Sequence, residues 1–376
     1  MAFRETLIVD AIPPRFPPAA PTQEALLREG EEAWVPRAQG VKWTLVSSPP
    51  LVIFCFIVTF ISGAIKQISE FPGGKHLASE DTGRGGRPLA KGLPSGAYVL
   101  SRGDLTLACR GEIPREAAAW WLRDALPAAL AARGRGDRLA RVPGPSGSGE
   151  LLAKQEWPSL QKSLLRAFLG RPSRSMKALH IGLHLQSNGV SAARAVAALE
   201  RRRWGVLRQS ALILEPCRGL TLREFILSRM AGLQEGKAKD SLRAALLGAI
   251  AREVAALHAS GVRQRDLKAP NIFVAELEDR LQLTLLDLEG MALLGSPPSL
   301  DVRIRDLSRL GVSFRESRVL AAGIREEDWR FLVTSYLGQW RGAAPDPRDL
   351  EDFLRRALAW ALRKEERNRR RGRPIE

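Results

Sequence analysis

A polar loop between a long amphipathic helix and two short apolar strands constrains the fold of this chain more than any other sequence feature. The helix is predicted over residues 241–259, where apolar residues recur every three or four positions and form one face. The loop belongs to the segment GVRQRDLKAPNIFV at 261–274, and the second strand ends within LTLLDLEG at 283–290. This order predicts that polar side chains gather where a loop and a strand end meet.

The sequence around this segment divides into a strand-rich part and a helical part. From Asp137 to Gly219, short strand-like runs are separated by turn residues, with one helix-like stretch at 173–187. The predicted strands in this part are 138–142, 150–155, 195–201 and 210–215. After Gly219 the sequence favours helices. We therefore expect an α+β, two-lobed fold with a small β-rich N-lobe, a helical C-lobe and a cleft between them.

Four polar residues of the central segment have the chemistry that phosphoryl transfer requires. Asp266, Lys268 and Asn271 lie on the loop, and Asp287 follows the second strand. Oxygen ligands can hold Mg²⁺ against phosphates, a carboxylate can deprotonate an acceptor hydroxyl, and a cation can stabilise charge on the transferring group. The Asp-x-x-x-x-Asn spacing matches a kinase catalytic loop. A polar turn between a helix and a hairpin is the structural alternative.

These motifs resemble the protein-kinase-like superfamily, and more closely the bacterial lipopolysaccharide kinase family, whose members phosphorylate Kdo or heptose sugars of the lipopolysaccharide core. The resemblance covers about residues 137–338. It rests on Gln-Arg-Asp-Leu-Lys-Ala-Pro-Asn at 264–271, Leu-Asp-Leu-Glu-Gly at 286–290 in place of Asp-Phe-Gly, and Arg-Asp-Leu-Ser-Arg-Leu at 305–310. The resemblance implies a protein-kinase-like fold with ATP and Mg²⁺ as cofactors.

The resemblance also implies roles for the polar residues of the central segment. Asp266 corresponds to the catalytic base, and Lys268 is expected to stabilise the transferred phosphate. Asn271 and Asp287 are expected to hold Mg²⁺.

Two further positions are implied to bind ATP. Lys154, in Glu-Leu-Leu-Ala-Lys, resembles the ATP-contacting lysine on the third strand of the small lobe, with an exposed strand residue as the alternative. The segment from Glu215 to Cys217 resembles the hinge whose backbone contacts adenine.

Three departures from the family pattern leave the activity open. The usual His before Arg-Asp is Gln264, and the helix at 173–187 has no acidic residue that could pair with Lys154. Nothing after Asp287 resembles an activation segment that ends in Ala-Pro-Glu. The missing activation segment counts against an ordinary protein kinase, so a sugar kinase, which the family resemblance implies, is the leading hypothesis. An atypical serine/threonine protein kinase and a pseudokinase that acts as a nucleotide-binding or scaffold module are the alternatives.

The predicted organisation has four parts. Residues 1–110 form an N-terminal extension, partly disordered, with a candidate membrane segment at 45–65. Residues 111–215 form the N-lobe, 216–340 the C-lobe, and 341–376 a C-terminal helix and basic tail. A buried hydrophobic segment and a wrongly chosen start codon are the alternatives to a membrane span.

The charge of the chain suggests acidic partners, with a solvated surface that reflects a biased composition as the alternative. The 58 Lys and Arg residues exceed the 41 Asp and Glu residues and leave a formal charge of +17. The family resemblance implies a saccharide or lipopolysaccharide acceptor, and the positive charge suggests an anionic membrane surface as a further partner. Nucleic acid is not expected, because the basic tail at 363–373 has no interleaved aromatic residues. The use of cytosolic ATP places the catalytic lobe in the cytoplasm, in association with the inner membrane.

The three cysteines and four histidines are too few and too scattered for a disulfide framework or a zinc site. The cysteine content fits a reducing compartment. Metal-hydrolase chemistry therefore has no support in the sequence.

Overall fold

The computed structural model describes residues between Ala97 and Gly372. The candidate membrane segment at 45–65 lies outside the described residues. Within the described part of the chain, no helix combines the length and the apolar character that a membrane crossing requires. The described residues are 97–131, 139–145, 149–278 and 280–372.

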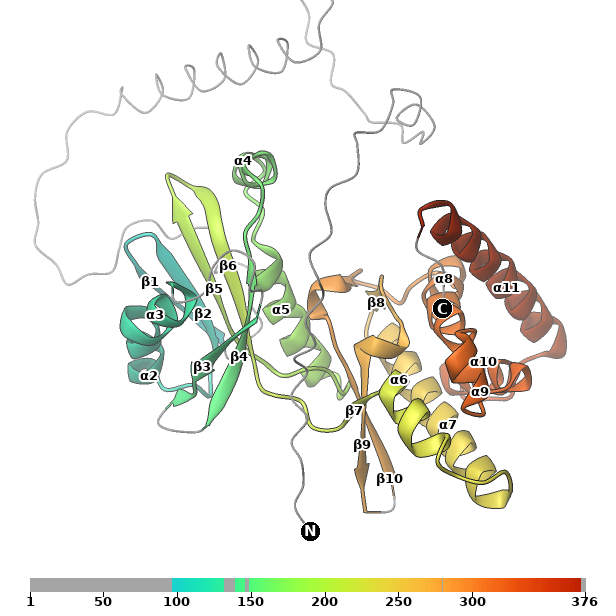
Figure 1. Ribbon diagram of the computed structural model, residues 1–376. Helices are drawn as coiled ribbons and strands as arrows, with labels where there is room; N and C mark the ends of the chain where they lie inside the picture. Colours follow the sequence, from blue (N-terminus) through green and yellow to red (C-terminus); the bar gives the residue numbers. More distant parts are fainter. Residues whose placement is uncertain (1–96, 132–138, 146–148, 279, 373–376) are drawn as a thin grey trace, which may run out of the picture. The chain divides into compact units, whose positions relative to one another are not determined.

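Six antiparallel strands form the sheet of the N-lobe (Figure 1). They are β1 (Ala97–Arg102), β2 (Leu105–Arg110), β3 (Leu139–Pro143), β4 (Glu150–Glu156), β5 (Ala195–Arg203) and β6 (Val206–Leu214). Their order across the sheet is β1-β2-β5-β6-β4-β3. Successive side chains of a strand point to opposite faces. Leu107 therefore packs with Trp121 on one face, whereas Ala108 packs with Leu179 on the other.

Helices cover both faces of this sheet, which explains why its central strands β2 and β5 are buried along most of their length (Figure 1). These elements are α2 (Arg115–Trp120), a π-helical turn (Trp121–Ala125) and α3 (Leu126–Ala131) on one side, and α5 (Arg174–Ser187) on the other. A further helix, α4 (Leu160–Phe168), follows β4 and contacts β6. Ser173 caps the start of α5, because its Oγ accepts a hydrogen bond from the backbone N–H of Met176.

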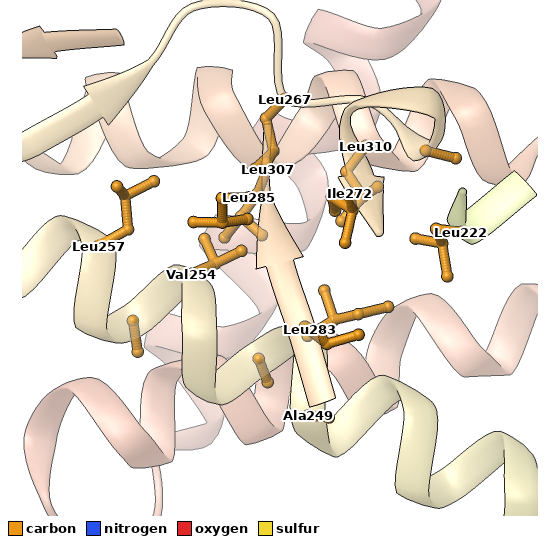
Figure 2. Packing of buried hydrophobic residues seen from close by; sticks show 14 of the residues in the cluster. Leu222, Ala249, Val254, Leu257, Leu267, Ile272, Leu283, Leu285, Leu307 and Leu310 are labelled. Atoms are coloured by element: carbon orange, nitrogen blue, oxygen red, sulfur yellow. The ribbon is translucent and has the colours of Figure 1, made fainter. Parts of the chain in front are cut away.

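The C-lobe is mainly helical. Its helices are α6 (Leu222–Phe225), a π-helical turn (Ile226–Met230), α7 (Lys237–Ala259), α8 (Leu300–Phe314), α9 (Ser317–Ala321), α10 (Glu326–Arg341) and α11 (Pro347–Arg370). The apolar face predicted for α7 is buried against α10, β10 and β8. Figure 2 shows Val254 and Leu257 of α7 close to Leu285, with Leu267 and Leu307 above them. This packing fixes the loop that follows α7 against the lobe's core.

Two small antiparallel sheets hold the central segment in place. Their strands are β7 (Leu220–Thr221), β8 (Val262–Gln264), β9 (Ile272–Leu277), β10 (Arg280–Leu285) and β11 (Met291–Leu293). One sheet has the order β10-β9-β7, and the other pairs β11 with β8. Two 3₁₀ turns, Ala269–Asn271 and Leu288–Gly290, complete the segment. The helix, loop and two strands predicted from the sequence are therefore present in that order.

The linking segment between the lobes requires glycine at one position. Gly219 has a φ of +106°, and a Cβ there would lie 2.3 Å from the carbonyl oxygen of Val274. Only glycine accepts both the positive φ and this close approach. The chain can therefore pass from the large sheet to β7 without pushing β9 away.

The α+β, two-lobed architecture predicted from the sequence is confirmed. The predicted lower boundary of the N-lobe, residue 111, falls just after the β1–β2 hairpin, and β2 pairs with β5 in the same sheet. This pairing joins residues that are far apart in the sequence, so local patterns could not reveal it. The division into an extension, two lobes and a tail stays a prediction.

Candidate active site

Three of the candidate residues meet on the loop between β8 and β9. The Lys268 Nζ lies 2.8 Å from the Asp266 Oδ2. The Asn271 side-chain amide donates to the backbone carbonyl of Asp266 at 2.8 Å, and its Nδ2 is 3.4 Å from the Asp266 Oδ2. The Asp266 and Lys268 side chains are each about half exposed. The loop therefore presents a carboxylate with a cation and an amide on either side of it.

Gln264 joins this loop to the strand end that carries Asp287. Its side-chain Nε2 donates to the carbonyl of Leu286 at 3.0 Å and lies 3.4 Å from the carbonyl oxygen of Asp287. Its Oε1 accepts a hydrogen bond from the backbone N–H of Asp266 at 3.3 Å. The side chain is buried. Gln264 therefore replaces the expected His with a group that bonds to both halves of the site.

Replacing Gln264 with Ala should lower the free energy of unfolding by about 1–3 kcal/mol, because it leaves the Leu286 carbonyl and the Asp266 N–H unpaired in the interior. Urea unfolding measures this loss. Gln282→Ala, on an exposed position of β10, is the matched control and should change stability little. Equal stability of Gln264→Ala and wild type would show that these hydrogen bonds do not support the loop.

Asp287 has an unusual backbone conformation. Its φ is 55° and its ψ is 56°, in the left-handed region that Asp tolerates better than most residues. A Cβ at Gly290 would lie 2.6 Å from the Asp287 Oδ2 and 2.9 Å from the Gln264 Oε1. Glycine at position 290 therefore leaves room for the Asp287 carboxylate, which explains the Gly of the Leu-Asp-Leu-Glu-Gly motif.

Lys154 reaches Asp287 from the opposite lobe. It lies on β4, and its Nζ is 2.7 Å from the Asp287 Oδ1 and 2.9 Å from the Glu289 Oε2. Burial alone would lower the pKa of Lys154, but the attraction of Glu289 and Asp287 outweighs it and raises the pKa above its usual value. Lys154 is therefore a charged residue held between two carboxylates, and not a solvated strand residue.

Glu289 is the acidic partner of Lys154 that the sequence did not reveal. The partner was expected on α5, which has no acidic residue, whereas Glu289 follows Asp287 by two positions. The left-handed turn at Asp287 and the 3₁₀ turn after it bring both carboxylates to one ammonium group. The Glu of the Leu-Asp-Leu-Glu-Gly motif was the available signal.

The two hinge candidates lie apart from these residues. Glu215 and Cys217 belong to the segment between β6 and β7, and the Glu215 Oε1 is 3.3 Å from an Arg194 guanidinium nitrogen. Burial, and then the charge of Glu215, raises the pKa of the Cys217 thiol. In the described part of the chain, neither residue bonds to Lys154 or to the catalytic-loop candidates. The structure therefore brings together five of the seven predicted site residues.

A buried ionic network on α8 lies beneath the loop. Asp306 is fully buried, and its Oδ1 accepts from Arg309 at 2.8 Å and lies 3.4 Å from an Arg263 nitrogen. The Ser313 Oγ accepts a hydrogen bond from the backbone N–H of Ala269 at 3.2 Å. Helix α8 therefore supports both ends of the catalytic loop.

The oxygen groups around Asp287 are of the kind that Mg²⁺ uses. The Asn271 amide oxygen and the Asp287 and Glu289 carboxylates are hard ligands, and Mg²⁺ commonly takes one or two carboxylates together with phosphate oxygens and water. The backbone carbonyl of Asn271 accepts from the N–H of Leu286, which holds the loop next to this turn. Across the described residues, no group of three or more His, Cys, Asp or Glu side chains forms a ready-made metal cage.

Comparison with known proteins gives one family match. The sequence model of the lipopolysaccharide kinase (Kdo/WaaP) family matches residues 132–336. Among curated proteins, no sequence matches this chain.

Many solved structures are similar to this chain. One is described as WaaP in complex with acyl carrier protein; it is 21% identical, the match covers 69% of this chain and 98% of that chain, and the TM-score is 0.49. Another is the BubR1 kinase domain, which is 13% identical with coverage of 79% and 76% and a TM-score of 0.31.

The family match covers more than half of the chain and includes all of the site candidates described above. It confirms the resemblance that the sequence motifs indicated. The chain therefore belongs to the lipopolysaccharide kinase (Kdo/WaaP) family, a family of kinases.

Proposed function

We propose that this protein transfers the γ-phosphoryl group of ATP to a hydroxyl of a Kdo- or heptose-type sugar in a lipopolysaccharide-core-like saccharide. The observation that carries the proposal is the position of Lys154, which reaches from the N-lobe to within 2.7 Å of Asp287 beside the catalytic loop. A family of lipopolysaccharide kinases supplies the substrate class.

Asp266 acts as the general base in this proposal. Its carboxylate is half exposed and is oriented by Asn271 and Lys268. The acceptor oxygen attacks the γ-phosphorus while its proton passes to Asp266, and the bond from the γ-phosphorus to the leaving oxygen of ADP breaks. Lys268 supplies positive charge next to the transferring group. The carboxylate therefore has both the exposure and the neighbours that a base for a bulky acceptor needs.

Asn271 and Asp287 would hold Mg²⁺, with Glu289 beside them. When bound, the ion would neutralise charge on the phosphates of ATP. Gln264 keeps Asp266 and Asp287 in register, because it bonds to the backbone of both segments. The protein's part is thus to fix the spacing between the base and the acidic turn.

Lys154 and the hinge segment bind ATP in this proposal. The ammonium group of Lys154 bonds phosphate oxygens while Glu289 holds it in place. In the described part of the chain, the backbone N–H and carbonyl of Cys217 make no backbone hydrogen bond, so they are available to adenine. The segment from Glu215 to Cys217 thus offers the donor and acceptor pair that a purine edge requires.

The reaction is proposed to take place at the inner face of the cytoplasmic membrane. ATP is supplied by the cytosol, and the formal charge of +17 favours an anionic surface as a neighbour.

Replacing Glu289 with Gln should raise the KM for ATP by about tenfold or more, because a charge-assisted bond that holds Lys154 is lost. Initial rates at varied ATP measure this change. Glu276→Gln, which removes only the surface pair with Arg229, is the matched control and should leave KM unchanged. An unchanged KM in Glu289→Gln would show that Glu289 does not position Lys154.

Transfer of labelled phosphate tests the proposed function directly. The full chain is incubated with labelled ATP, Mg²⁺ and either lipopolysaccharide core oligosaccharide or a generic protein substrate. The proposal expects label on the oligosaccharide only. Label on the protein alone would favour an atypical protein kinase, and label on neither substrate would contradict the proposed reaction.

A further inference from the structure

The last helix, α11, carries cationic side chains in its C-terminal half and lies outside the region that the family model matches. Helix α11 packs along α8 (Figure 1). The guanidinium of Arg309 lies 4.9 Å from the centre of the Trp360 ring, and the Arg315 Nε is 2.7 Å from the Glu365 Oε1. Ser313, which bonds to the catalytic loop, lies between these two arginines on α8. The C-terminal half of α11 therefore covers the part of α8 that supports the loop.

Three cations form a stripe on this half of α11. Lys364 and Arg367 follow Trp360 by four and seven residues, and Arg371, the C-cap residue of α11, follows Arg367 by four, so the three lie along the side of the helix that carries Trp360. Among the described residues, none of the three forms an ion pair with a carboxylate. Arg369 and Arg370, by contrast, both pair with Glu366. The stripe, defined as Lys364, Arg367 and Arg371, is therefore an uncompensated positive charge.

The like charges of the stripe repel one another, and Lys364 also lies close enough to Asp266 for the two charges to attract each other. Burial lowers the pKa of Lys364, and the nearby Arg367, Arg309 and Arg371 lower it further, whereas Asp266 opposes the shift. An anion bound at the stripe would offset this repulsion and accept charge-assisted hydrogen bonds. An anion bound at Lys364 would therefore lie within electrostatic range of Asp266, the base that receives the acceptor's proton.

We propose that Lys364, Arg367 and Arg371 bind a carboxylate or phosphate group of the saccharide acceptor and so position its hydroxyl beside Asp266. The acceptor is therefore an acidic saccharide rather than a neutral one. This inference rests on the proposed function and adds an acceptor-binding element to it.

The position of the stripe favours the acceptor over a lipid bilayer as its partner. The exposed apolar side chains of α11, Leu358 and Leu362, lie on the opposite face of the helix, about half a turn away from Arg367 and Arg371. A helix lying on a bilayer would place these leucines toward the lipid and the stripe away from it. Arg369 follows Leu362 by seven residues and lies on this outer face.

A pair of charge-matched double variants tests the inference in the full chain. Lys364→Gln/Arg367→Gln removes two charges from the stripe, and the control Arg369→Gln/Arg370→Gln removes two from the outer side. Each variant is titrated by calorimetry with core oligosaccharide, and with the same oligosaccharide after its carboxyl groups are reduced and its phosphates are removed. Thermal unfolding verifies that both variants fold. Arg371→Gln, at the exposed end of the helix, supplies a third variant that cannot disturb the packing on α8.

The inference expects that the wild-type protein binds the acidic oligosaccharide at least about tenfold more tightly than the uncharged form. Lys364→Gln/Arg367→Gln should lower the affinity for the acidic oligosaccharide by about tenfold or more and leave the affinity for the uncharged form unchanged. Arg371→Gln should lower the affinity for the acidic form less, and the control should bind it as tightly as wild type. Equal losses in the two double variants, or no preference of the wild type for the acidic form, would overturn it. If Lys364→Gln/Arg367→Gln sediments less than wild type with phosphatidylglycerol vesicles but keeps its oligosaccharide affinity, the inference is also overturned and the stripe is assigned to a membrane.

The same titrations separate this inference from the proposed function. Charge-dependent binding of the oligosaccharide without phosphate transfer would contradict the proposed reaction and retain the stripe as a binding site. If wild type transfers phosphate to the oligosaccharide, and Lys364→Gln/Arg367→Gln binds the acidic oligosaccharide as tightly as wild type, the proposed reaction is retained and the stripe is rejected as an acceptor site.

Discussion

Replacing Asp266 with Asn should lower kcat by about a hundredfold or more, with little change in the KM for ATP. The amide cannot accept the proton of the acceptor hydroxyl, but it keeps the size of the carboxylate and can still bond to Asn271 and Lys268. The loss should therefore fall on the chemical step and not on nucleotide binding. Initial rates of phosphate transfer at saturating ATP measure it.

A matched control for this variant is available on α8. Asp301 lies on the exposed first turn of α8 and pairs with Arg356, so Asp301→Asn should leave the rate unchanged. If Asp266→Asn retains most of the wild-type rate, Asp266 is not the base.

Replacing Asp287 with Asn should lower Mg²⁺-dependent turnover by about a thousandfold, equivalent to about 4 kcal/mol of transition-state stabilisation. The substitution removes the carboxylate that lies beside Lys154 and the catalytic loop. Asn tolerates the left-handed backbone conformation almost as well as Asp, so the turn should be kept. Rates across a range of Mg²⁺ concentrations measure the effect.

The fold of Asp287→Asn should be close to that of wild type, because Glu289 still pairs with Lys154. Its thermal midpoint therefore serves as the control for the loss of turnover. A folded Asp287→Asn protein that turns over at the wild-type rate would refute the metal-binding role.

The catalytic loop was predictable because its residues are close in the sequence. Asp266, Lys268 and Asn271 fall within six residues, and the helix before them and strands after them have clear periodicity. In a contiguous motif of this kind the chain itself keeps the side chains within reach of one another. The two-lobed architecture followed from the same order of elements.

The partner of Lys154 could not be predicted in the same way. The contact joins β4 to a turn more than a hundred residues later, and it depends on the backbone conformation of Asp287. The acid-free α5 and Gln264 had kept a pseudokinase open as an alternative to the sugar kinase when only the sequence was considered. Glu289 supplies the missing carboxylate and Gln264 bonds both halves of the site, so neither departure leaves the site incomplete.

The role of the C-terminal segment also depended on tertiary structure. The sequence predicted only a C-terminal helix and a basic tail, since charge alone does not identify a neighbour. The contact between Arg309 and Trp360 turns one face of that helix toward the catalytic loop. Only the packing of α11 on α8 reveals which of its arginines face the site.

The most direct test is whether Asp287 and the catalytic loop bind a metal-bound triphosphate. It measures the binding of a non-hydrolysable ATP analogue with and without Mg²⁺. Calorimetry on wild type, Asp266→Asn and Asp287→Asn gives the affinities. We expect Mg²⁺ to tighten binding to wild type and Asp266→Asn, and to have no effect on Asp287→Asn. An undiminished effect of Mg²⁺ in Asp287→Asn would contradict the account.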